Sequence, residues 1–106
     1  MTTMYQIIYW RDIPAQVKVK AGRERVSRPL PERFERAIDQ AAMYAGLIGS
    51  DDYLAEWHRS EWTEREGQAE AVADALVAEI ETDYTRERLR EMARNSGREP
   101  ELIPPA

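Results

Sequence analysis

The chain of 106 residues is long enough for one domain with a single hydrophobic core. It contains no cysteine, which excludes disulfides, thiol nucleophiles and cysteine-ligated metals. Charged residues make up 33% of the chain and the net charge is −5, with acidic and basic residues interspersed, so a general binder of nucleic acids or anionic membranes is disfavoured.

The N-terminal 20 residues predict two strands joined by a tight turn. Residues 4–10 are apolar on both faces, which suits an interior strand. Pro14 lacks a backbone donor, so the hydrogen-bond ladder should break over residues 11–14. Residues 15–20 then alternate between apolar and polar, as a strand with one buried face does. A third, short strand is expected at residues 25–28, where basic side chains suit a sheet edge.

Three helices are predicted from apolar periodicity. The first begins near Pro31 and Glu32, because proline and an acidic residue are both favoured in a first turn, and it ends at Gly46. The second covers residues 68–82, and a more charged third helix covers residues 86–95.

Residues 53–66 fit two periodicities. A helical period places Leu54, Trp57, His58 and Trp62 in one stripe, whereas a period of two divides these side chains between two faces. We interpret the segment as a strand, because it would return the chain to the sheet before the next helix begins.

These elements predict one α+β domain over residues 1–97. Its architecture is two-layer, with a mainly antiparallel sheet of three to four strands and two to three helices on one face. Residues 98–106 contain three prolines and are expected to form a flexible tail. No apolar run approaches the roughly 18 residues of a membrane-spanning helix, and none resembles a signal peptide, so we expect a cytoplasmic protein.

Residues for catalysis or metal binding are sparse. His58 is the only histidine, which excludes a multi-histidine metal site, and we interpret it as a packing residue rather than a general base. The chain has no EF-hand loop, no phosphate-binding glycine loop and no Gly-x-Ser-x-Gly element. We therefore predict no catalytic residue, no metal site and no cofactor.

The triplet of Trp10, Arg11 and Asp12 is the best candidate for a specific contact. Tryptophan and arginine dominate the hot spots of protein interfaces, and these two residues precede a rigid turn. In the alternative, Trp10 fills the core and the two charges form a local ion pair. Two further tryptophans have the same two interpretations, as part of an exposed partner surface or as part of the core. The candidate partner-binding residues are Trp10, Arg11, Asp12, Trp57, His58 and Trp62.

The run IYWRDIPAQV at residues 8–17 is similar to the opening of a small bacterial domain family labelled "virulence factor", which also occurs within conserved virulence factor C-type proteins. Residues 33–35 with 37–43, and residues 50–57, match the same pattern, and the resemblance extends from about Tyr5 to Ile80. The resemblance implies a small companion of folate- and corrinoid-dependent proteins of one-carbon methyl transfer. It supplies no catalytic residues.

Three hypotheses follow. The first, which we favour, is a noncatalytic accessory domain that docks on a larger protein, for which the resemblance suggests a methylenetetrahydrofolate-reductase-like or methyltransferase enzyme. The second is a binding protein or enzyme for a pterin-like molecule, in which Trp10 or Trp57 stacks on the ring and Arg11 or Asp12 makes the polar contact. The third is a homo-oligomeric module that pairs through an edge strand or the C-terminal helix. Neither nucleic acid nor membrane is an expected partner.

Overall fold

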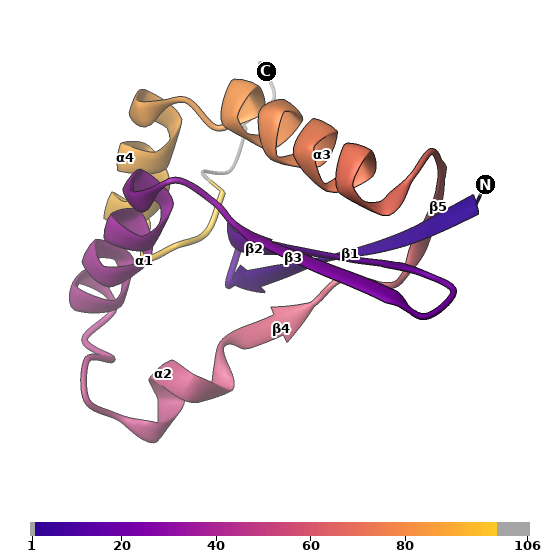
Figure 1. The fold of residues 1–106 in the computed structure, drawn as a ribbon. Coiled ribbons are helices and arrows are strands. Elements are labelled where there is room, and N and C mark those ends of the chain that lie inside the picture. The colour runs from indigo at the N-terminus through magenta and orange to yellow at the C-terminus, as the bar shows by residue number, and fades with distance from the viewer. Residues whose placement is uncertain (1, 100–106) are drawn as a thin grey trace, which may run out of the picture.

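The computed structural model describes residues 2–99. An antiparallel sheet of five strands forms its centre (Figure 1). The strands are β1 (Thr2–Trp10), β2 (Ile13–Ala21), β3 (Glu24–Pro29), β4 (Trp57–Arg59) and β5 (Thr63–Glu66). Strand β1 is central, because β2 pairs along one side of it while β4 and β5 share the other side.

Four helices accompany the sheet: α1 (Glu32–Tyr44), α2 (Asp51–Ala55), α3 (Ala69–Asp83) and α4 (Arg86–Arg94). Helix α3 lies across one face of the sheet, where it contacts β2 and β3, and α1 and α4 pack together at one end (Figure 1). The predicted α+β class and antiparallel sheet are thus confirmed. The sheet has five strands instead of three to four, and there are four helices instead of two to three, because the segment before α3 forms α2 and two very short strands.

That segment combines both periodicities seen in the sequence. Residues 51–55 are helical, and the chain then returns to β1 as β4 and, after a short loop, as β5. The strand interpretation therefore holds for seven of the residues between 53 and 66, while the first three belong to α2.

The turn between β1 and β2 departs from regular geometry. Arg11 has a φ of 51°, which is rare for a residue other than glycine, and the pairing register shifts between Ile8 and Tyr9. Pro14 does not end the ladder as expected, since β2 begins at Ile13, and the register shift leaves Ala15 as the extra residue of a bulge.

The hydrophobic core lies between the sheet face that carries Val17 and Val19 and the helices α1, α3 and α4. Its largest fully buried side chains are Trp10, Phe34, Ile13 and Met92. None of the helices within residues 2–99 has both the length and the apolar character needed to cross a membrane.

The C-terminal end of the described chain returns to the β1–β2 turn. The backbone N–H of Asp12 donates to the carbonyl of Gly97 at 2.9 Å, and the N–H of Glu99 donates to the Asp12 carboxylate at 2.8 Å. Residues 98 and 99 of the expected tail are thus in contact with the domain, whereas residues 100–106 lie outside the described residues.

Candidate interaction surface

Trp10 lies in the core. Its side chain has no exposed surface, and its indole N–H donates to the carbonyl of Tyr53 at 2.9 Å. The ring packs beside that of Tyr53, with 5.6 Å between centroids, and against the backbone of Gly97. Of the two interpretations that the sequence left open, the structure supports core packing for this tryptophan, so a partner cannot contact it while the domain is folded.

Arg11 and Asp12 hold three segments of the chain together. The Arg11 guanidinium donates to the carbonyl of Ser96 at 2.9 Å and lies 3.3 Å from the carboxylate of Glu56, which follows α2. Asp12 is bonded to Gly97 and Glu99, as described above. Only 13% of the Arg11 side chain is exposed, so these contacts serve the fold and leave little of it for a partner.

His58 sits on the edge strand β4. Its ring stacks on that of Tyr9, with centroids 5.4 Å apart and planes within 13°, and its Nε2–H donates to the carbonyl of Arg11. These contacts agree with the packing role. The side chain is nevertheless exposed, next to a shallow hollow lined by Tyr9, Arg11, Asp12, His58, Tyr84 and Glu99.

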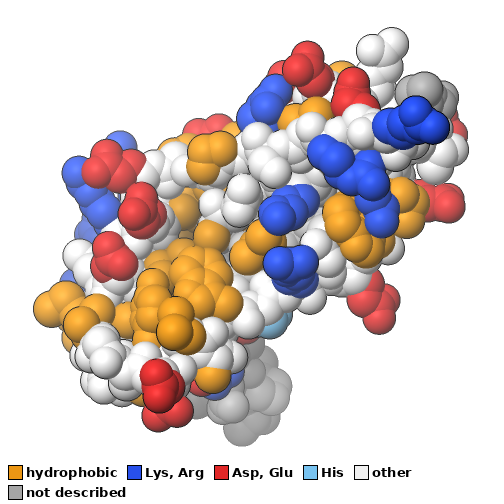
Figure 2. All heavy atoms as spheres, turned by 60° about the horizontal axis from the view of Figure 1, so that its bottom comes forward, with side chains coloured by type: hydrophobic (Ala, Val, Ile, Leu, Met, Phe, Trp, Pro, Cys, Tyr) orange, Lys and Arg blue, Asp and Glu red, His pale blue; other side chains and the backbone are white. Residues whose placement is uncertain are grey.

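A hydrophobic patch surrounds the end of α2. We use this name for Leu54, which is 66% exposed, Trp57, which is 36% exposed, and the half-buried Tyr53. The rings of Tyr53 and Trp57 meet edge to face, with 6.3 Å between centroids. Figure 2 shows hydrophobic side chains gathered at this end of the molecule. A contiguous group of exposed aromatic and aliphatic side chains is typical of a contact surface.

A groove of about 370 Å³ runs beside the patch. Its aromatic lining is Tyr53 and Trp57, and α1 contributes Glu35, Ile38 and Asp39. The remaining lining residues are Ile8, Ala15, Gln16, Pro29 and Leu30. The groove can therefore accept an apolar or aromatic group and, at one wall, a donor or a cation.

The pKa of the Tyr53 hydroxyl is affected by the acidic residues that line this groove. Burial raises its pKa above the usual 10.0, and the carboxylates of Asp39 and Glu35 raise it further. Both carboxylates are thus close enough to this side chain to affect its ionisation.

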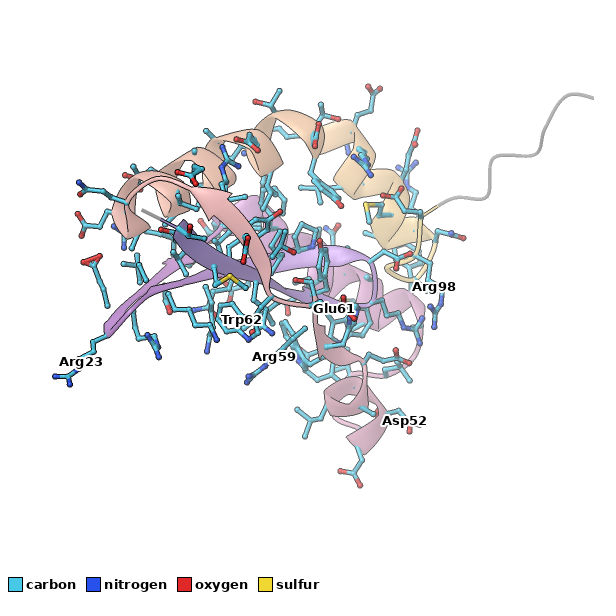
Figure 3. The ribbon with its side chains drawn as sticks, turned by 90° about the vertical axis from the view of Figure 1, so that its right-hand side faces the viewer. Arg23, Asp52, Arg59, Glu61, Trp62 and Arg98 are labelled. Atoms are coloured by element: carbon cyan, nitrogen blue, oxygen red, sulfur yellow. The ribbon has the colours of Figure 1, made fainter. Side chains whose placement is uncertain are left out.

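Trp62 lies apart from this patch, in the loop between β4 and β5. It is 37% exposed, and the ammonium of Lys20 lies 4.0 Å from its ring centre. Figure 3 shows Trp62 and Arg59 on the side of the sheet that faces away from α3. Of the six residues predicted for partner binding, Trp57, His58 and Trp62 are accessible, while Trp10, Arg11 and Asp12 serve mainly the interior of the domain.

Sequence reasoning missed the groove and its carboxylates. Glu35 and Asp39 are spaced as any solvated pair on a helix is, and only the placement of α1 against the sheet makes them wall residues. A second hollow, of about 610 Å³ between α1 and α4, was also missed; it is lined by Gln40, Met43, Tyr44, Arg90 and Arg94. Within residues 2–99, no three histidine, aspartate or glutamate side chains converge as a metal site would require.

Comparison with known proteins identifies one family. The family model described as "Virulence factor" matches residues 8–93, most of the chain. No curated protein and no solved structure matches.

Proposed function

The chain belongs to the virulence factor family, and we propose that it is a noncatalytic accessory domain that docks on a larger protein through the hydrophobic patch. The observation that carries this proposal is the exposure of Leu54 and Trp57 beside a groove. Full burial of such a side chain is worth roughly 1.5–3 kcal/mol, and burial against a partner would recover the share that is still exposed, 66% of Leu54 and 36% of Trp57.

The contacts of His58 give its ring a structural role. In this protein one face of the imidazole stacks on Tyr9, and Nε2 is engaged with a backbone carbonyl. The ring is held by contacts that stabilise the β4 edge.

For the partner, we propose a folate- or corrinoid-dependent one-carbon enzyme, of the methylenetetrahydrofolate-reductase-like or methyltransferase kind. This finer proposal rests on the family resemblance alone. It can fail while the docking proposal stands, because the patch would serve any partner with a complementary apolar surface.

The test is co-purification from the native organism, with wild type compared with the Leu54→Ala/Trp57→Ala variant. Tyr44→Ala is the matched control, since Tyr44 is 62% exposed but lines the other hollow. We expect one large protein to be recovered with wild type and the control, and to be lost with the patch variant, whose affinity should fall by about 2 kcal/mol or more. Equal recovery with a folded patch variant would refute docking through the patch. A multimeric mass in light scattering would favour the homo-oligomeric module instead.

The groove favours a second candidate function, the binding of a pterin-like ring. Its aromatic wall offers a stacking surface, and its volume falls within the range of small-molecule sites. The pyrimidinone edge of a pterin presents adjacent N–H donors, and the carboxylate of Glu35 or Asp39 in the lining of the groove is a matching acceptor.

Tryptophan fluorescence separates the two candidates. Titration with a pterin or folate should quench wild type if the groove binds the ring, and the saturable part of the quenching should disappear in Trp57→Phe. Asp39→Asn should weaken the same titration. A signal that changes linearly with pterin in all three proteins would reject the pterin site and leave the docking proposal intact.

A further inference from the structure

Basic residues form ion pairs on one face of the sheet and not on the other. On the face covered by α3, Arg28 of β3 pairs with Asp74, at 3.4 Å, and Arg65 of β5 pairs with Glu79, at 2.6 Å. Every basic side chain that these strands direct toward α3 thus meets a carboxylate of that helix.

The opposite face, which we call the open face, carries unpaired cations. Strand register places Lys20 beside Arg25 and Lys18 beside Ser27 on this face, and Ile8 beside Arg59. Among the described residues, no carboxylate lies within ion-pair distance of Lys18, Lys20, Arg25 or Arg59. Figure 2 shows the blue side chains gathered over the sheet beside hydrophobic ones.

This distribution is unexpected for an acidic chain. The protein has 20 acidic and 15 basic residues, so carboxylates outnumber cations in the chain as a whole. On the open face the register places the carboxylates of Glu64 and Glu66 along β5, with the side chain of Met4 between Glu64 and Lys20, against the cations of Lys18, Lys20, Arg25 and Arg59. The open face is therefore a local positive surface on a negative protein, the arrangement that attracts an anionic group.

The side chains of the open face favour an acidic polypeptide over a nucleic acid as the anionic partner. Bases of single-stranded nucleic acid stack on aromatic side chains, but the strand positions at the centre of this face are Met4, Gln6 and Ile8, and the ring of Trp62, which is 37% exposed, already packs against the ammonium of Lys20. The apolar side chains of Met4 beside Lys20 and of Ile8 beside Arg59 suit a polypeptide in which carboxylates alternate with apolar residues. The face is also continuous with the groove, since Ile8 and Gln16 belong to both.

We propose that the open face binds an acidic segment of the partner protein. This inference rests on the proposed function, because it describes the same partner and extends the contact from the hydrophobic patch along β1 and β2. Lys18, Lys20 and Arg59 would contact carboxylates, and Trp62 with Met4 would contact the apolar residues of the segment.

The experiment measures fluorescence anisotropy of a short labelled peptide of alternating glutamate and leucine. The charge-reversed variant is Lys18→Glu/Lys20→Glu. The matched control is Arg90→Glu/Arg94→Glu, which makes the same change of charge at exposed cations on α4 that also lack an ion pair among the described residues.

We expect wild type to bind with an affinity that falls as salt is added, and the Lys18/Lys20 variant to bind roughly tenfold or more weakly. The control should stay within about twofold of wild type, because its charges lie on another surface. Equal losses in the two variants would show a net-charge effect and overturn the proposal.

Three further outcomes also overturn it: no binding by wild type, equal binding of a peptide with lysine in place of glutamate, or tighter binding of an oligouridylate than of the acidic peptide. The last would assign the face to nucleic acid. Retention of the native partner by the Lys18/Lys20 variant and its loss from the Leu54/Trp57 variant would leave docking through the patch standing while the open-face inference fails.

Discussion

Replacement of Gly97 by alanine tests how the C-terminal segment closes over the core. Gly97 has a φ of 88°, in the region that side chains disfavour, and a Cβ there would lie 2.7 Å from Cζ3 of Trp10 and 3.1 Å from Cε3. The left-handed backbone costs about 1–2 kcal/mol with a side chain, and overpacking in a core typically costs about 1–3 kcal/mol more. We expect Gly97→Ala to lower the free energy of unfolding by about 2–5 kcal/mol, a large part of the roughly 5–15 kcal/mol of a small domain.

The matched control is Gly46→Ala, since Gly46 has a φ of 71° and a Cβ at this position would have nothing within 4 Å apart from its chain neighbours. It should lose only the backbone contribution of about 1–2 kcal/mol. A second comparison uses Trp10→Phe, which removes the ring atoms in question. In that background, Gly97→Ala should cost about as much as the control.

Urea denaturation followed by circular dichroism supplies the four stabilities of this double-mutant cycle. If Gly97→Ala costs no more than Gly46→Ala, or costs the same with tryptophan or phenylalanine at position 10, the contact between Gly97 and Trp10 does not limit stability and the reasoning is refuted.

Two other predictions concern Arg11 in the β1–β2 turn and Tyr84. Arg11→Ala removes a hydrogen bond to Ser96 and the ion pair with Glu56, so we expect the free energy of unfolding from urea denaturation to fall by about 1–3 kcal/mol. The control Arg36→Ala removes an exposed ion pair and should cost less than about 1 kcal/mol. Similar losses in the two variants would contradict the structural role of Arg11. Burial raises the pKa of Tyr84 above 10.0, so its contribution to stability is complete below pH 10 and is lost as the pH rises through the raised pKa. Tyr84→Phe should therefore lose less thermal stability than wild type above pH 10, and parallel losses would argue against this origin.

The longer elements were predictable because their patterns are local. The alternation of Val17 and Val19 with lysines identifies a half-buried strand, and the apolar periods of α1, α3 and α4 span several turns. Strands β4 and β5 have three and four residues, too few for any alternation to be distinguished from a helical stripe. Their strand geometry comes from pairing with β1, which is a tertiary effect.

The location of Trp10 could not be predicted for a related reason. Its position at the end of a strand suits both an interface and a core, and burial is decided by Gly97, which is distant in the sequence. The charge difference between the sheet faces likewise depends on which face α3 covers. Lysines at positions 18 and 20 indicated a wet face, but the pairing of Arg28 with α3 required the register of β3.

The contact of the C-terminal segment with the β1–β2 turn has a consequence for folding kinetics. The hydrogen bonds from Arg11 to Ser96 and from Glu99 to Asp12 span 85 and 87 positions of the chain. During synthesis the β1–β2 hairpin leaves the ribosome first, yet Trp10 stays uncovered until α4 and residue 97 have emerged. Closing so long a loop costs conformational entropy before its contacts form, so we expect the C-terminal segment to cover Trp10 in a late and slow step of folding. In that interval the exposed indole is a natural target for chaperones.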